Sequence, residues 1–178
     1  MLALVENCLN ELEVTANQNR ENAKSSGEKY IWFSTQKNKD MKLKLSNESE
    51  NLSTENRRFK ARNSGEGGSG GEWLYDFTLR EFDSDNNFVG VPLVAEIELS
   101  DSKPRGLIYD FNKLLQSDAE SKAFIFQQRD EDGFNDILKR IETAIQKYKH
   151  KVSSEYLISC WITSRYIFKM KRIKVNNA

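Results

Sequence analysis

The sequence predicts an α/β protein in which a mixed central sheet is flanked by helices. Three observations support this fold class: apolar residues recur at helical spacing in three segments, apolar and polar residues alternate in others, and the two kinds of segment are interleaved along the chain. Helices that cross between strands are expected to cover the faces of a mixed sheet. At 178 residues the chain is long enough for one core, so we expect a single domain over residues 1–178.

The first helix is expected at residues 2–20, where Leu2, Val5 and Leu9 follow helical spacing. Residues 35–71 are polar and end in a glycine-rich run, so we expect an insertion that buries little surface and is partly mobile. Short apolar islands at residues 30–33 and 41–45 interrupt this polar part of the chain, and the first island is compatible with a strand. Basic residues also collect there, and the interspersed acids favour a solvated loop over a nucleic-acid-binding arm.

Two strand-like segments, residues 72–81 and 93–100, are the most informative part of the chain. Each has one apolar face and one face that carries acid, with Asp76 on the first segment and Glu96 and Glu98 on the second. A turn rich in Asp and Asn joins the two segments. If the hairpin reverses near residues 85 and 86, the numbers of facing residues sum to about 172, which sets Asp76 opposite Glu96. Gly90 and Pro92 are compatible with a bulge that shifts this register.

Facing carboxylates on neighbouring strands repel one another unless a positive charge lies between them. A divalent cation would supply that charge, because Mg²⁺ takes oxygen ligands and needs only one or two carboxylates besides water or phosphate. The residue types alone also fit an edge hairpin whose acidic face lies in water, since antiparallel strands with charged outer faces are common.

The second half of the chain predicts alternating helices and strands. Pro104 can open a helix that runs to about Glu120, and a later helix carries acids at its front and bases at its end. The expected elements are a helix at 104–120, a strand at 123–127, a helix at 134–148, and strands at 156–163 and 166–175.

Composition excludes several classes of function. Lys plus Arg and Asp plus Glu both number 27, so no global field draws the chain to nucleic acid or membrane, and a polyanion would have to meet a local patch. The single histidine, His150, excludes the usual zinc clusters and fits a cation at a helix end. Cys8 and Cys160 follow apolar patterns, which favours buried thiols in a reducing cytoplasm. No apolar run reaches the length of a membrane span, and the first residues do not have the pattern of a secretory signal.

The order of these elements and acids resembles the core of the PD-(D/E)XK nuclease superfamily, the restriction-endonuclease-like fold. The match covers roughly residues 72–128. It depends on the runs Tyr75-Asp76-Phe77, Ala95-Glu96-Ile97-Glu98, Ile108-Tyr109-Asp110-Phe111-Asn112-Lys113-Leu114-Leu115 and Phe124-Ile125-Phe126-Gln127. These runs are also similar to a group of uncharacterised bacterial proteins that are assigned to this fold and carry an E-x-E variant of the motif.

The resemblance implies a hydrolase, a nuclease that uses Mg²⁺ or Mn²⁺ and acts on DNA or RNA, with Asp76 and Glu96 as metal ligands. Glu98 stands where the family generally has lysine, and Lys113 on the following helix is the candidate replacement. A salt bridge from Lys113 to Asp110 is an equally good interpretation of that lysine. The missing lysine also leaves open a degenerate member of the fold that binds nucleic acid or protein without chemistry. The resemblance also implies that Glu6 could assist metal binding, as an acid on the first helix does in some family members, although a surface acid is the simpler interpretation.

Overall fold

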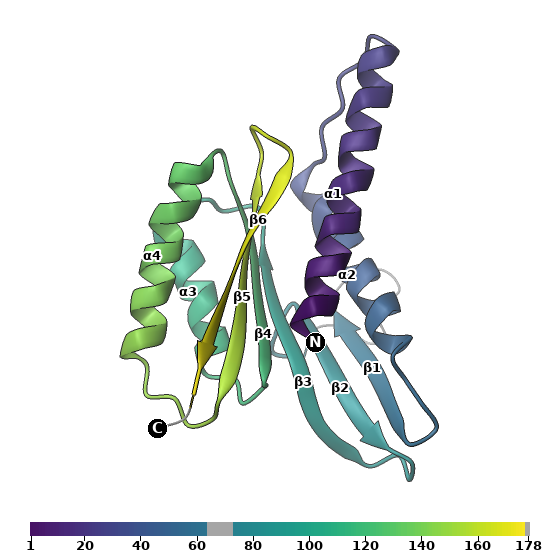
Figure 1. Cartoon of the computed structure of the whole chain (residues 1–178), viewed down its shortest axis with the longest axis vertical. Helices are drawn as coiled ribbons and strands as arrows, with labels where there is room; N and C mark the ends of the chain where they lie inside the picture. Colours follow the sequence, from purple (N-terminus) through teal and green to yellow (C-terminus); the bar gives the residue numbers. More distant parts are fainter. Residues whose placement is uncertain (64–72, 177–178) are drawn as a thin grey trace.

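The computed structural model describes residues 1–63 and 73–176 and confirms the α/β fold class (Figure 1). Six strands form one mixed sheet, and four helices flank it. The elements in chain order are α1 (Leu2–Ser25), α2 (Ser34–Glu50), β1 (Arg57–Asn63), β2 (Phe77–Asp83), β3 (Phe88–Glu98), α3 (Pro104–Leu115), β4 (Ser121–Gln128), α4 (Glu131–Lys147), β5 (Ser154–Ile162) and β6 (Ile167–Val175).

The strands lie side by side in chain order, from β1 to β6. Strand β2 is antiparallel to both β1 and β3. Strand β4 is parallel to both β3 and β5, and β6 returns antiparallel to β5. Parallel neighbours need a crossover connection, and α3 and α4 supply the two crossovers. The mixed sheet that the interleaved pattern predicts is therefore the observed one.

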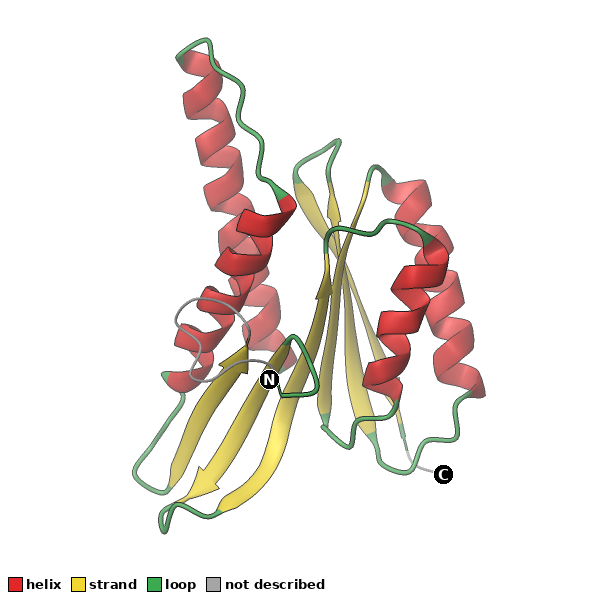
Figure 2. Cartoon of the chain, turned by 180° about the vertical axis from the view of Figure 1, so that it is seen from behind, coloured by secondary structure: helices red, strands yellow, loops and turns green. Residues whose placement is uncertain are grey.

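The helices form two layers on opposite faces of the sheet (Figure 2). The layer of α1 and α2 packs on one face of the sheet, and α3 and α4 cover the other face over β3, β4 and β5. Strand residues alternate between the two cores: Leu93 and Ala95 face α1 and α2, whereas Val94 faces α3 and α4. None of the helices in the described ranges combines the length and hydropathy that crossing a membrane requires.

The register of the central hairpin agrees with the sequence prediction. Phe77 pairs with Ala95, so facing residue numbers sum to 172, and the register shifts beyond Leu79, close to Gly90. Asp76 directly precedes the first residue of β2 and is therefore at the level of Glu96, although it is not itself part of the ladder. The acidic residues of the two segments thus meet at the end of the paired region.

The prediction that residues 35–71 bury little surface is wrong. Part of this segment forms α2 and part forms β1, and both pack into the core through Met41, Leu45, Phe59 and Ala61. Helix α2 was not predicted because four of its six buried residues are polar: lysine and serine side chains lie inside with partners of their own. Residues 30–33 form no strand, although Trp32 is buried. The glycine-rich run lies in 64–72, outside the described residues.

The remaining elements lie close to their predicted positions. Helix α1 extends to Ser25, beyond the predicted end, whereas α3 ends at Leu115 rather than near residue 120. Asp130 accepts a hydrogen bond from the backbone N–H of Gly133 at 3.0 Å and so caps the first turn of α4. The acids expected at the front of this helix are therefore its N-terminal cap and first turn.

Candidate functional site

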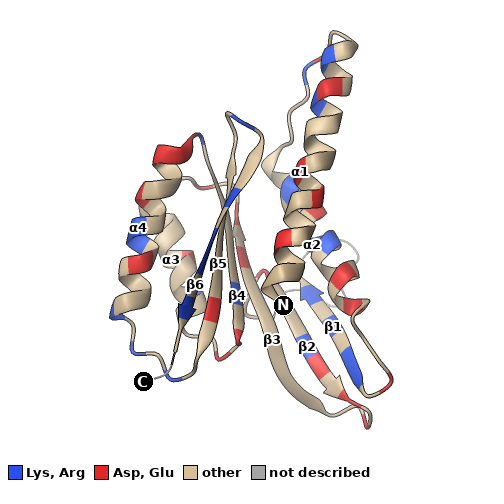
Figure 3. Cartoon of the chain, viewed as in Figure 1, with Lys and Arg blue, Asp and Glu red and all other residues tan. Residues whose placement is uncertain are grey.

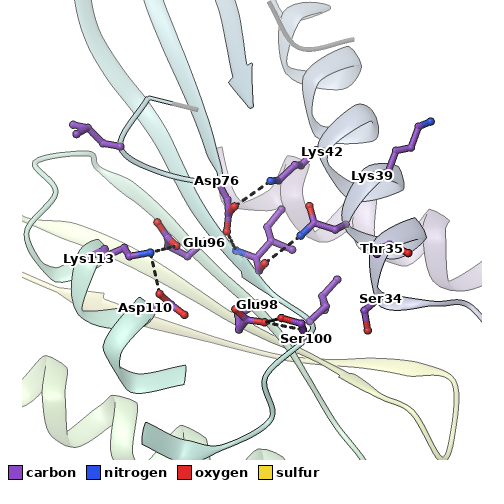
Figure 4. A pocket seen from close by; sticks show the side chains of 14 residues that line it. Ser34, Thr35, Lys39, Lys42, Asp76, Glu96, Glu98, Ser100, Asp110 and Lys113 are labelled. Atoms are coloured by element: carbon purple, nitrogen blue, oxygen red, sulfur yellow. Dashed lines mark hydrogen bonds and ion pairs between the residues drawn. The ribbon is translucent and has the colours of Figure 1, made fainter. Parts of the chain in front are cut away.

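A polar pocket of about 730 Å³ opens beside the second half of β3, between α2 and α3 (Figure 4). Its lining comes from four parts of the chain: the first half of α2, the segment before β2, the end of β3, and the last turns of α3. Seven ionisable side chains line it, namely Lys39, Lys42, Asp76, Glu96, Glu98, Asp110 and Lys113. All four residues predicted from the sequence as site residues line this one pocket.

Asp76 is held at the unpaired edge of β3. Beyond Ala95 the third strand has no partner in β2, and the Ile97 backbone N–H donates instead to the Asp76 carboxylate at 2.9 Å. The Ile97 carbonyl accepts from the Asn38 side chain of α2 at 3.4 Å. Side chains therefore take the place of a neighbouring strand at this edge. The second Asp76 oxygen forms an ion pair with Lys42 Nζ at 3.0 Å.

Glu96 is the most unusual group in the pocket, because its carboxylate is nearly enclosed. The residue is 3% exposed, and its Oε1 atom is buried without a hydrogen-bond partner. Its Oε2 atom accepts from Lys113 Nζ at 3.2 Å. Burial, together with the negative charge of Asp76, raises the pKa of Glu96 from 4.5 to about 7, against the opposing effect of Lys113. A buried carboxyl with a shifted pKa at the wall of a pocket is characteristic of a functional site.

Lys113 makes both contacts that the sequence left as alternatives. Its ammonium lies 3.2 Å from Glu96 and 2.9 Å from Asp110, so it bridges the two carboxylates (Figure 4). Burial acts to lower the pKa of Lys113, but its hydrogen bonds to Asp110 and Glu96 outweigh that effect and raise the pKa above its usual value. The residue therefore stays cationic beside Glu96 over the whole physiological pH range.

Glu98 lines the pocket but does not join Asp76 and Glu96. Its Oε1 atom accepts hydrogen bonds from the Ser100 backbone and hydroxyl and from the Asp101 backbone, at 2.6 to 2.8 Å. These contacts tie its carboxylate to the turn that follows β3. Across residues 1–63 and 73–176, no group of three or more His, Cys, Asp or Glu side chains is arranged to hold a metal ion. Asp76 and Glu96 are close enough to interact, because, in addition to burial, the charge of Asp76 raises the pKa of Glu96.

Two residues considered from the sequence lie elsewhere. Glu6 binds Arg172 of β6 through two hydrogen bonds of 2.7 and 2.6 Å, so it does not assist this site. That arginine lowers the pKa of Glu6. The ring of His150 contacts the Ile145 carbonyl in the last turn of α4 at 2.8 Å, which agrees with a role at a helix end. Neither residue lines the pocket.

Sequence reasoning missed the contribution of α2, above all Lys42 and Asn38. The signal that could have revealed this helix is the spacing of Lys37, Met41 and Leu45, which repeat every four residues and are all buried. Only two of these three side chains are apolar, so the apolar pattern shows an island at residues 41–45 rather than a helix. Lys42, next to Met41, is the α2 lysine that binds Asp76.

A scan against protein-family models, a search of curated proteins and a search of solved structures each found no match to this chain.

Proposed function

We propose that this protein is a Mg²⁺- or Mn²⁺-dependent phosphodiesterase that acts on nucleic acid, a nuclease of the PD-(D/E)XK type. The observation that carries the proposal is Glu96: a buried carboxylate with one unpartnered oxygen, beside Asp76 and in contact with a lysine, in the wall of an open polar pocket. Burying an ionisable group without satisfying it is costly, so a fold that retains one has a use for it.

The order of the elements supports the assignment to this fold. Two helices precede three antiparallel strands, and a further helix leads to a fourth strand that is parallel to the third. One acid stands at the beginning of the second strand and another in the third, with a lysine on the helix that follows. This is the arrangement on which the resemblance to the nuclease superfamily depends.

The residues of the pocket fit a divalent cation. Glu96 Oε1 lacks a partner, the charge of Asp76 raises the pKa of Glu96, and Mg²⁺ commonly takes only one or two protein carboxylates. Asp76 and Glu96 would hold the ion. When bound, such an ion polarises a phosphoryl oxygen and makes a coordinated water more acidic.

The other side chains would orient the acids and the substrate. Lys42 and the Ile97 N–H fix the Asp76 carboxylate, which limits its motion at the edge of β3. Lys113 places a fixed positive charge beside Glu96, where it can offset the charge of a phosphodiester. It would thereby replace the lysine that the family generally has at the position of Glu98. Glu98 shapes the loop between β3 and α3.

A second candidate function is a degenerate member of this fold that binds nucleic acid or protein without catalysis. The ion pairs favour it: Lys42 already neutralises Asp76, and Lys113 already contacts Glu96. Internal cations of this kind could replace a metal altogether. The two candidates differ in whether the pocket binds a divalent cation.

Hydrolysis is tested with labelled single-stranded and duplex DNA and RNA, incubated with Mg²⁺, Mn²⁺ or EDTA. We expect metal-dependent cleavage that falls by about 100-fold or more in Asp76→Asn and Glu96→Gln. Glu142→Gln removes an exposed acid on α4 and serves as the matched control, with unchanged cleavage. Equal background activity in the wild type and all variants would remove the nuclease proposal.

A metal titration separates the two candidates without a substrate. A cation that binds only the folded protein raises its melting temperature. We expect millimolar Mg²⁺ or Mn²⁺ to do so at pH 8, and to have a smaller effect at pH 6, where Glu96 is largely protonated and must lose its proton before it can bind. An unchanged melting temperature at pH 8 favours the non-catalytic candidate.

A cytoplasmic location is part of the proposal. Cys8 and Cys160 are both buried, unpaired thiols. Burial raises the pKa of Cys8 to about 11 and also raises the pKa of Cys160, which keeps both thiols protonated and unreactive. Two inert thiols agree with a reducing compartment.

A further inference from the structure

The outer strands of the sheet carry a row of cations on the face that points away from α1 and α2. On β1, Phe59 and Ala61 face the α1 and α2 core, so Arg58, Lys60 and Arg62 point to the opposite face. Arg80 of β2 lies directly across from Lys60 in the ladder. We call these four residues the basic row. Figure 3 shows β1, with its Lys and Arg residues in blue, next to β2.

One acid, Glu50, acts on the basic row through its charge, which acts to raise the pKa of Arg80, but no ion pair joins it to the row. Among the residues that the structure describes, none of its four members forms an ion pair. The Nε atoms of Arg62 and Arg80 are buried without an acceptor, and burial together with the charge of Arg62 lowers the pKa of Arg80. By contrast Arg57, which points to the other face of β1, pairs with Glu81 at 2.5 Å. Positive charge is therefore concentrated on one face, and no ion pair compensates it among the residues that the structure describes.

Aromatic rings extend the same face. The Lys60 ammonium nitrogen lies 5.1 Å from the centroid of the Phe82 ring. The centroids of the Phe82 and Phe88 rings are 5.8 Å apart. Phe88 in turn packs edge-on against Trp73 at 5.7 Å. Phe88 is 50% exposed and Trp73 is 38% exposed, and a groove of about 400 Å³ runs beside them toward the end of α3. Exposed rings of this size usually mark a contact surface.

Within residues 1–63 and 73–176, no helix covers these strands on this side. Helix α3 packs on β3 and β4, and α4 packs on β4 and β5, so β1 and β2 extend past both helices (Figure 2). The face is thus an open platform with cations at one end and rings at the other.

We propose that this platform binds single-stranded nucleic acid, with the basic row on the phosphates and the bases stacked on Trp73 and Phe88. A row of cations matches a polyanion, and exposed rings match unpaired bases, whose faces are free to stack. A duplex offers no such free faces because its bases stack on one another. A protein partner would call for a less charged centre to its interface.

The platform joins the acidic pocket through the segment before β2. Leu74 lines both the pocket and the groove, while its neighbours Trp73 and Asp76 belong to one each. A strand lying on the platform would therefore pass Trp73 and reach the carboxylates. This inference rests on the proposed function for its catalytic meaning, and it names the substrate class: single strands or unpaired ends rather than uninterrupted duplex.

Binding is tested by fluorescence anisotropy in EDTA, where the proposed hydrolysis cannot proceed, with a labelled single-stranded DNA, a single-stranded RNA and the matching duplexes. We expect at least one single-stranded probe to bind about tenfold or more tightly than its duplex. The two single-stranded probes show which polymer is preferred.

Substitutions test the cations and the aromatic rings of the platform separately. Arg62→Gln/Arg80→Gln should weaken binding and reduce the slope of log affinity against log salt by about 1.4, roughly 0.7 for each cation removed. Trp73→Ala should weaken binding about tenfold and leave that slope unchanged. Arg58→Gln/Lys60→Gln repeats the first test at more exposed positions should the arginine pair be needed for folding. Lys171→Gln/Lys174→Gln, on the opposite edge strand β6, is the matched control and should bind as the wild type does.

Equal or tighter binding of duplex would overturn the proposal, as would an equal loss in the β6 control or no binding at about 100 µM protein. The result can be separated from the nuclease test. Binding without any metal-dependent cleavage overturns the proposed function alone. Cleavage that Trp73→Ala and both double variants leave unchanged, KM included, overturns the platform alone.

Discussion

The two faces of the sheet differ in the side chains that they bury. Under α3 and α4 the packing is apolar and aromatic, with Phe111 in contact with Phe124 and Tyr156 and with isoleucines along α4. Helix α2 on the other side buries lysines beside its Met and Leu. Lys37, only 3% exposed, donates to Gln127 at 2.6 Å, and burial lowers its pKa to about 8.

This difference shows where the fold serves stability and where it serves a site. A buried lysine stabilises a fold less than an apolar side chain of the same volume. The α2 lysines nevertheless stay, one bound to Gln127 and one to Asp76 at the wall of the pocket. On the α2 side the buried Lys42 borders the pocket, whereas Lys122, buried in the α3 and α4 layer beside the Tyr156 hydroxyl, does not line it. Glu96 lies on the α3 face and, with Asp110 and Lys113 of α3, completes the pocket.

The largest effect is expected from breaking the apolar side. Phe111→Ala removes a fully buried ring from between Phe124 and Tyr156 and should lower the free energy of unfolding by about 4 kcal/mol. Urea denaturation measures this change in the free energy of unfolding. Tyr109→Ala, on the exposed face of the same helix, should change stability by about 0.5 kcal/mol or less. Similar losses in the two variants would contradict the assignment of Phe111 to the buried, stabilising face of α3.

Glu96 should give the next largest effect, with a pH dependence. Its folded pKa of about 7 lies above the ordinary 4.5, so its protonated form stabilises the fold below pH 4.5 and that stabilisation is lost as pH rises through 7. At pH 8.5 Glu96→Gln, which resembles the protonated side chain, should be more stable than the wild type by about 3 kcal/mol. Near pH 4 the two should unfold at the same denaturant concentration. A difference that does not vary with pH would show that ionisation of Glu96 is not its cause.

A smaller loss is expected from the α2 side. Lys42→Met leaves Asp76 with only the Ile97 N–H among the contacts described above, and should reduce stability by about 2 kcal/mol. In a double-mutant cycle, Asp76→Asn should cost less in the Lys42→Met background, with a coupling of about 1 kcal/mol. Lys139→Met, an exposed lysine on α4, is the matched change in the other layer and should be nearly neutral. Additive losses of stability in the double variant would show that Lys42 and Asp76 do not stabilise the fold through each other.

The smallest effect sharpens the comparison at the edge of the pocket. Leu74 has φ of 76° and is 79% exposed, so it bears the strain of a left-handed conformation without the gain of burial. Leu74→Gly should raise stability by about 1 kcal/mol, or a few degrees in melting temperature. Gly27→Ala, at φ of 72° and with open space around its Cβ, should do the reverse. A loss in Leu74→Gly would mean that the leucine side chain makes contacts that outweigh the strain.

Much of the fold follows from local patterns in the chain. The alternation in residues 72–81 and 93–100 predicted the hairpin and its register, although β2 itself begins only at Phe77, and the stripes beginning near Pro104 and Phe134 predicted α3 and α4. The structure of these segments follows from the sequence because one face of each is apolar and the other is polar. Helix α2 was not predicted, because lysines and serines make up four of its six buried residues and the lysines find their partners far away in sequence.

The candidate site divides in the same way. Asp76, Glu96 and Lys113 were recognisable in advance because strand and helix periodicity fixes which residues share a face. Their surroundings depend on the tertiary structure. Lys42 binds Asp76, the turn after β3 binds the Glu98 carboxylate, and burial raises the pKa of Glu96. Periodicity is a property of neighbouring residues, and a sequence therefore contains it directly. Burial and ion pairing depend on chain segments that meet only after folding, and no local pattern records them.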